Sequence, residues 1–130
     1  MRSKLGLTFS RVQSKLGSWD PQRGVLSIVD FNLPKTVDHG YTNNLWEVQS
    51  SPYAGDVINS YNDGPTETGE RLGAGGFFEL ETISPALALG ADQSFTHRHR
   101  TLRIEGDRDR LSHVAEHVFG VGLDEIEARF

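Results

Sequence analysis

"GFFELETIS" (residues 76–84) and "QSFTHRHRTLRIEG" (residues 93–106) are the two strongest β-strand patterns of the chain. Successive side chains of a strand point to opposite faces of its sheet. Glu79 and Glu81 therefore share one face of the first segment, an unusual arrangement for an otherwise apolar strand. In the second segment histidines and arginines alternate, at His97, Arg98, His99 and Arg100. We expect the two segments to form neighbouring strands of an antiparallel sheet.

The rest of the chain extends this β-rich pattern. Strands are expected at "VLSIVDFNL" (residues 25–33) and "NLWEVQS" (residues 44–50), and fourteen glycines and five prolines punctuate the sequence. Residues 51–75 are rich in Gly, Pro, Asn and Asp and are expected to be mostly loop. With 130 residues, 36% of them hydrophobic, the chain predicts one mainly β domain over residues 1–130.

A short helical tail is expected at about residues 107–129. Asp107 is a suitable N-cap for "RDRLSHVAEHVF", whose apolar residues recur at helical spacing, and Gly120 is a suitable stop. "LDEIEARF" follows as a second, weaker helical segment. His113 and His117 lie four residues apart on this helix without an evident third metal ligand, so we expect them to be exposed surface residues.

Composition excludes several classes of protein. The net charge of −5, with scattered basic residues, argues against a nucleic-acid partner. No apolar run is long enough to span a membrane, and no signal peptide is evident. The absence of cysteine excludes a disulfide framework and a thiol nucleophile, and it is compatible with a cytoplasmic location.

The pair His97 and His99 raises the question of a metal site. In a cupin motif five residues separate Gly from a His-x-His pair, and three or four residues separate the pair from Glu. Here six residues separate Gly90 from His97 and five separate His99 from Glu105, so both gaps are longer by one. Two histidines are also fewer than the three ligands that stable transition-metal sites usually take from the protein. We expect no metal and no cofactor, and we interpret these histidines as structural or as contacts to a ligand.

Two like charges at i and i+2 repel each other, which leaves three interpretations for Glu79 and Glu81. They are exposed to solvent, or bridged by Arg98 or Arg100, or held for a ligand. The spacing alone does not choose among these three.

A combination of motifs resembles a known superfamily. "GGFFELETISPALALGADQSFTHRHRTLRIEGD" resembles the C-terminal part of galactose mutarotase-like proteins, in which a Glu-Thr step on one strand precedes a turn into a long strand. Together "GDVINSYNDG", "FFELETISPALAL" and "VFGVGLDEI" look like the C-terminal half of an uncharacterised bacterial family in that superfamily. The resemblance spans most of residues 1–127.

This resemblance implies an antiparallel β-sandwich equivalent to half of a mutarotase-like supersandwich, with a sugar bound on an open sheet face. In aldose 1-epimerases the Glu of a Leu-Glu-Thr step is the general base, and Leu80-Glu81-Thr82 matches that step. Glu81 is thus the expected catalytic residue. Further candidates for ligand contacts are Glu79, Asn59, Tyr61, Asn62, Asp63, His97, His99 and Arg100, with Trp46 as either a stacking platform or a core residue.

The departure from the epimerase pattern concerns the general acid. Epimerases take it from a histidine far upstream of the base, whereas only 80 residues precede Glu81 here, and His39 matches no epimerase motif. We therefore expect a carbohydrate-binding or vestigial mutarotase-like domain without epimerase activity. Two alternatives remain open: a cupin-like metal-dependent enzyme using His97 and His99, and an interaction module without a small-molecule site. Half of a supersandwich leaves apolar surface uncovered, which predicts a homodimer.

Overall fold

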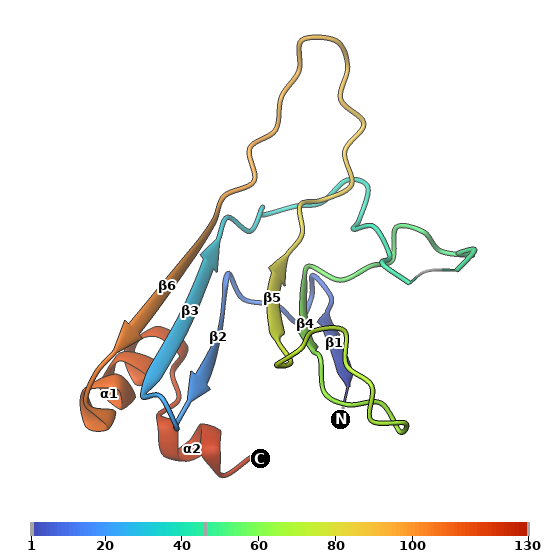
Figure 1. Cartoon of the computed structure of the whole chain (residues 1–130). Helices are drawn as coiled ribbons and strands as arrows, with labels where there is room; N and C mark the ends of the chain where they lie inside the picture. The colour runs from blue at the N-terminus through green and yellow to red at the C-terminus, as the bar shows by residue number, and fades with distance from the viewer. Residues whose placement is uncertain (1, 46, 130) are drawn as a thin grey trace. The chain divides into compact units, whose positions relative to one another are not determined.

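The structure is a computed structural model that describes residues 2–45 and 47–129. The described chain contains two three-stranded antiparallel sheets and two short helices (Figure 1). This confirms the mainly β, antiparallel fold with a helical C-terminus. The chain divides into two compact units, each made of two separate segments. One unit contains Met1–Val12 and Leu33–His97, and the other contains Gln13–Asn32 and Arg98–Phe130.

The sheet of the first unit has the order β1-β4-β5, with β1 at Ser3–Leu7, β4 at Ile58–Asn62 and β5 at Phe78–Thr82. Both pairings are antiparallel, and β4 lies between the other two strands. Asn59 pairs with Gly6 on one side and Glu81 on the other, and Tyr61 pairs in the same way with Lys4 and Glu79. Paired residues project from the same face of a sheet.

These registers give the sheet two different faces. One face carries Lys4, Gly6, Asn59, Tyr61, Glu79 and Glu81, and we call it the polar face. The opposite face carries mainly apolar residues, among them Leu5, Leu7, Ile58, Phe78 and Leu80. The alternation predicted for residues 76–84 is therefore correct for the strand that forms there.

The sheet of the second unit has the order β2-β3-β6, with β2 at Lys15–Asp20, β3 at Val25–Phe31 and β6 at His99–Glu105. A tight turn joins β2 to β3. In that turn the Asp20 carboxylate accepts hydrogen bonds from the backbone N–H groups of Gln22 and Arg23, at 3.0 and 3.1 Å. Gly24 ends the turn with a φ of +61°, which a residue without Cβ adopts at little cost.

Helices α1 (Arg108–Phe119) and α2 (Leu123–Glu127) complete the second unit. Asp107 caps α1 by accepting hydrogen bonds from two backbone N–H groups of its first turn, and Gly120 ends it in the left-handed conformation. The core of this unit consists of Leu26, Ile28, Leu111, Ala115 and Leu123. The helical tail predicted from the sequence is confirmed, and His113 and His117 are exposed as expected.

Ionic and polar contacts fasten α2 to its neighbours. Arg108 donates hydrogen bonds to Asp124 at 2.6 Å and to Glu127 at 2.8 Å, and the Trp19 indole N–H donates to Glu127 at 2.7 Å. The hydrogen bonds from Trp19 and Arg108 lower the pKa of the Glu127 carboxyl, and the bond from Trp19 is the larger cause. A helix of five residues is too short to be stable alone, so its position depends on such contacts.

Some sequence predictions are wrong in detail. No strand forms at residues 44–50 among those described, because local hydrogen bonds occupy the backbone instead. Leu45 N–H donates to the Asn43 side chain at 3.1 Å, and the Gln49 side chain donates to the Leu45 carbonyl at 3.0 Å. Conversely, β1, β2 and β4 form where the sequence analysis expected no strand, and β4 lies inside the segment expected to be loop.

The expected pairing of the Glu79/Glu81 strand with the histidine strand is also wrong. β5 pairs with β4, whereas β6 pairs with β3 in the other sheet. β6 begins at His99, so His97 precedes the strand and does not share a strand face with His99. β5 thus takes the strand before it in the chain as its partner, whereas β6 pairs with a strand far away in the sequence.

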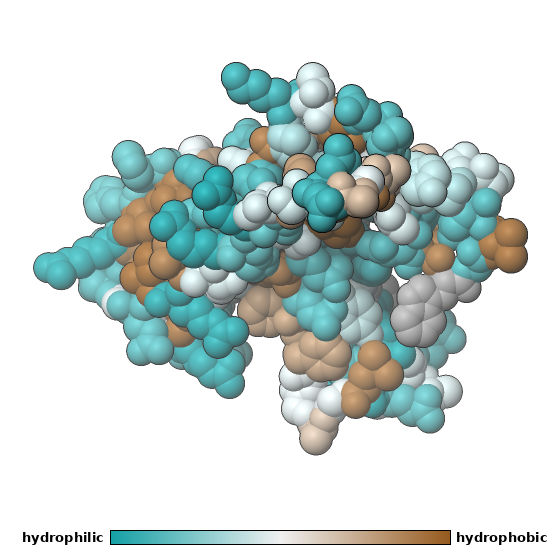
Figure 2. Space-filling model, turned by 90° about the horizontal axis from the view of Figure 1, so that it is seen from above, coloured by the Kyte–Doolittle hydropathy of each residue, from teal (hydrophilic) through white to brown (hydrophobic). Residues whose placement is uncertain are grey.

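The surface combines polar and apolar side chains. Figure 2 shows hydrophobic side chains scattered among hydrophilic ones on the face in view. Several large apolar residues are exposed, including Leu5, Val48, Leu72 and Phe78. In the described part of the chain, no helix combines the length and the apolar character needed to cross a membrane.

The core of the second unit generates a stability prediction. Leu111 is 2% exposed and packs with Leu26 and Leu123. Leu111→Ala should lower the free energy of unfolding by about 2–5 kcal/mol, because it removes buried methyl groups and leaves a cavity. Leu89→Ala, at a residue 51% exposed, should change it by less than about 1 kcal/mol. Urea denaturation followed by tryptophan fluorescence measures both, and equal effects would contradict the assigned core.

Candidate functional site

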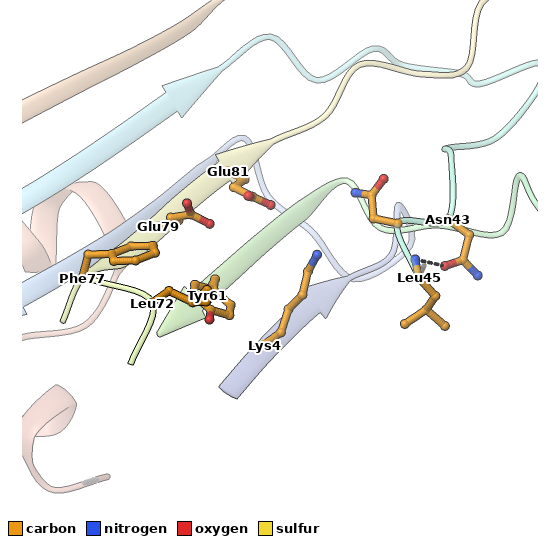
Figure 3. A pocket seen from close by; sticks show the side chains of 9 residues that line it. Lys4, Asn43, Leu45, Tyr61, Leu72, Phe77, Glu79 and Glu81 are labelled. Carbon is orange, nitrogen blue, oxygen red and sulfur yellow. Dashed lines mark hydrogen bonds between the residues drawn. The ribbon is translucent and has the colours of Figure 1, made fainter. Parts of the chain in front are cut away.

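The polar face of the β1-β4-β5 sheet borders an open cavity of about 720 Å³ (Figure 3). Strands contribute Lys4 from β1, Tyr61 from β4 and the two glutamates of β5. The loops add both polar and apolar groups. Among the described residues, the lining consists of Lys4, Asn43, Asn44, Leu45, Tyr61, Leu72, Phe77, Glu79 and Glu81.

Glu79 and Glu81 lie side by side on β5 (Figure 3). Desolvation by neighbouring groups is the largest cause that raises the pKa of the Glu79 carboxyl. A hydrogen bond with Glu81 and the charge of Glu81 raise that pKa further, and the Lys4 ammonium opposes the effect. The raised pKa of Glu79 thus reflects in part the closeness of a second carboxyl group on the same strand face. Such a pair accepts hydrogen bonds from hydroxyl or ammonium groups of a ligand.

An apolar surface lies beside the carboxyl pair. The rings of Tyr61 and Phe77 have centroids 5.7 Å apart and are tilted by 42°. Leu72, also part of the lining, is 71% exposed, and Phe77 is 40% exposed. Exposed aromatic and aliphatic side chains next to polar groups are typical of binding sites for ligands with both apolar and polar surfaces.

Asn59 and Gly6 form a buried polar spot on the same face. Asn59 is 2% exposed, and among the described residues its side-chain Nδ2 has no hydrogen-bond partner. A Cβ at Gly6 would lie 1.9 Å from Asp56 Oδ2 and 2.9 Å from Asn59 Oδ1. Only glycine at position 6 allows the Asp56 carboxylate to approach the sheet next to Asn59.

Asp63, expected as a ligand contact, is instead fully buried just after β4. Its carboxylate accepts hydrogen bonds from the backbone N–H groups of Leu72 and Gly73, at 3.0 and 2.9 Å, and from Arg2 at 3.3 Å. Its own N–H donates to the Phe77 carbonyl at 2.8 Å. Asp63 thus holds Leu72 and Phe77 where they line the cavity and does not itself line it.

The histidine segment lies outside the cavity. His97 Nε2 and Thr82 Oγ1 are joined by a hydrogen bond of 2.9 Å, and His99 Nε2 and Thr101 Oγ1 by one of 3.0 Å. Arg100 forms an ion pair with Asp30, so it does not bridge the two glutamates. In residues 2–45 and 47–129, no group of three His, Asp or Glu side chains is arranged to hold a metal ion.

Of the other expected contacts, Tyr61, Glu79 and Glu81 come together in the cavity, and Asn59 shares their face of the sheet. Asn62 is exposed and alternates to the opposite face, and Trp46 lies outside the described residues. Six residues of the lining were not predicted from the sequence: Lys4, Asn43, Asn44, Leu45, Leu72 and Phe77. The alternation in "SKLGL" was a signal for Lys4, whereas the loop residues depend on contacts that have no local signal.

The model of a protein family of unknown function, DUF6786, matches residues 1–130, the full length of the given chain. The chain belongs to the DUF6786 family. No curated protein and no solved structure is significantly similar to it. For this DUF6786 chain the geometry of the cavity is therefore the basis for a functional proposal.

The Asp63 anchor of the DUF6786 chain generates a prediction about stability and pH. Hydrogen bonds from Leu72 and Gly73, followed by the charge of Arg2, lower the pKa of Asp63 despite its burial. The ionised carboxylate therefore stabilises the fold above its unfolded-state pKa of about 4, and this contribution is lost as the pH falls through the lower folded-state pKa. Asp63→Asn should reduce the thermal unfolding midpoint at pH 7 by several degrees, and the difference from wild type should shrink below about pH 4.

Asp38→Asn is the matched control, because Asp38 is exposed. Differential scanning calorimetry over this pH range measures all three proteins. An Asp63→Asn midpoint equal to that of Asp38→Asn at pH 7 would show that Asp63 is not an anchor.

Proposed function

We propose that the DUF6786 chain binds a carbohydrate in the cavity on the polar face of the β1-β4-β5 sheet. The observation that carries this proposal is the pair Glu79 and Glu81 on a strand, in a cavity that the rings of Tyr61 and Phe77 also line. A sugar ring presents hydroxyl groups at its edge and C–H groups on its faces. Carboxylates accept hydrogen bonds from the hydroxyls, and aromatic rings pack against the C–H face.

The rest of the lining suits the same ligand. The Lys4 ammonium and the side-chain amides of Asn43 and Asn44 donate hydrogen bonds to hydroxyl oxygens. Leu45 and Leu72 extend the apolar surface. A cavity of about 720 Å³ falls within the usual size of small-molecule sites.

The resemblance to galactose mutarotase-like proteins supports Glu81 as the residue closest to the chemistry. Glu81 matches the residue that acts as the general base in aldose 1-epimerases, and here it lines the cavity. The described lining contains no histidine to act as the matching acid. A positioned proton donor contributes about 10²- to 10⁴-fold to a rate, so we propose binding without detectable epimerase activity.

The two alternatives receive different support. A cupin-like metal enzyme finds none in the histidine segment, where His97 and His99 each bond to a threonine. An interaction module is favoured by one specific observation. Leu5 and Phe78, on the apolar face of the same sheet, are 67% and 54% exposed.

The sugar proposal predicts a binding result and a kinetic result. D-Galactose or D-glucose at high millimolar concentration should shift amide signals of β4 and β5 in NMR spectra of the labelled protein. Glu81→Gln should weaken binding about tenfold or more, since it removes a charged hydrogen-bond acceptor. In polarimetry, neither wild type nor Glu81→Gln should speed the mutarotation of freshly dissolved α-glucose or α-galactose.

Glu105→Gln is the control, because Glu105 is exposed at the end of β6, in the other sheet. Unchanged spectra with every sugar would contradict the binding proposal and favour the interaction module. A rate above that of buffer, lost in Glu81→Gln and kept in Glu105→Gln, would contradict the claim of inactivity and identify Glu81 as the base of an isomerase.

The exposed apolar face supports the homodimer expected from the sequence. We expect a dimer in sedimentation velocity at tens of micromolar, because exposed apolar sheet faces tend to associate. Leu5→Glu together with Phe78→Glu should yield a monomer with unchanged circular dichroism. A wild-type protein that sediments as a monomer would contradict the dimer.

A further inference from the structure

We propose that the ligand of this cavity is an amino sugar, bound through its protonated amino group between Glu79 and Glu81. This inference rests on the proposed function and adds the chemical class of the sugar. Three observations lead to it: the charge of the lining, the absence of an ion pair to either glutamate among the described residues, and the buried amide of Asn59 next to Glu81.

The lining carries more negative than positive charge. Glu79 and Glu81 are acidic and Lys4 is its one basic residue, and the Asp56 carboxylate lies against Gly6 on the same face. In a cavity partly shielded from water, this balance repels phosphorylated sugars and uronic acids and attracts a cation.

The two glutamates have no closely paired cation in the described part of the chain. Among the described residues, no ion pair within 4.0 Å involves Glu79, Glu81 or Lys4. By contrast, Asp63 forms an ion pair with Arg2, and Asp30 forms one with Arg100. A pair of like charges that repel each other is stabilised when a ligand supplies the missing cation.

Geometry favours an ammonium group in particular. An ammonium has three N–H donors, enough to reach both carboxylates of a side-by-side pair and one further acceptor. Asn59 pairs directly with Glu81 across the sheet, is 2% exposed, and has an Nδ2 without a partner among the described residues. A buried amide without a hydrogen-bond partner is costly, so the sheet retains an unused donor next to Glu81.

The apolar part of the cavity distinguishes a sugar amine from a simple amine. Tyr61 lies between Lys4 and Glu79 in the register of the sheet, and its ring contacts that of Phe77. A pyranose that places its amino group on the carboxylates extends its C–H face over these rings. A small amine without a ring gains only the charge interaction.

Four probes test the inference by NMR titration at constant ionic strength: D-glucosamine, D-glucose, D-glucuronate and methylamine. D-Glucosamine should bind roughly 3- to 10-fold more tightly than D-glucose, the range expected for a partly exposed charged hydrogen bond. D-Glucuronate and methylamine should bind more weakly than D-glucose and D-glucosamine respectively.

Variants locate the effect. Glu79→Gln should bring D-glucosamine to within about twofold of D-glucose, because one carboxylate of the clamp is neutral. Glu81→Gln provides a second, independent variant, and Glu105→Gln should retain the wild-type preference. In wild type the preference should also decline as the pH falls, because Glu79, whose pKa is raised by desolvation and by Glu81, becomes protonated while the amine stays charged. The groups that face Glu79 are Glu81, Tyr61 and Lys4.

The outcomes separate this inference from the proposed function. Binding of D-glucose that equals or exceeds binding of D-glucosamine overturns the amino-sugar inference and leaves carbohydrate binding intact. Binding of methylamine as tight as that of D-glucosamine overturns the sugar part of the inference. No binding of any sugar overturns the proposed function, and the inference with it.

Discussion

Strand β4 pairs with β1 on one side and β5 on the other, in registers that bring Asn59 and Tyr61 onto the face of Glu79 and Glu81. Because strand side chains alternate strictly, a shift of one residue in either pairing would move every one of these groups to the opposite face. The floor of the cavity, its charge and its aromatic surface all depend on this register. Gly6 belongs to the same face, and any larger residue there would clash with the side chains of Asp56 and Asn59.

The loop that follows β4 depends on Asp63 in the same way. Two backbone amides and one guanidinium converge on its carboxylate, and the Arg71 side chain donates to its carbonyl at 2.9 Å. A glycine-rich segment has high conformational entropy when unfolded, so ordering it requires several strong contacts. One buried acid thus orders the loop that supplies the apolar wall of a site that it does not enter.

Local patterns were sufficient to predict part of this structure. The alternation at residues 78–82 and the caps Asp107 and Gly120 are encoded by neighbouring residues, and both elements form as expected. The central strand β4 was missed because its Asn59 and the Asp63 that follows it are buried polar residues, which are tolerated only through contacts with distant parts of the chain. At residues 44–50 a strand was predicted but does not form among the described residues. Leu45 and Val48 have the apolar character of a strand, but both are exposed and no described strand pairs with this segment. Pairing partners far apart in sequence leave no local trace, so the sequence identified the glutamate pair but not the lysine, the rings and the loop that surround it.

The division of each unit into two chain segments has a consequence for how the protein is made. In the second unit β3 pairs with β6, and the paired residues lie between 68 and 80 positions apart along the chain. On the ribosome, β2 and β3 emerge as an isolated hairpin, which is at best marginally stable in water. Residues 33–97, which make up most of the first unit, must be translated before β6 and the helices are synthesised. Long-range pairing of this kind slows folding and leaves strand edges open for association in the meantime. The most strongly buried strand, Val25–Phe31, therefore stays without one of its two neighbouring strands until late in synthesis.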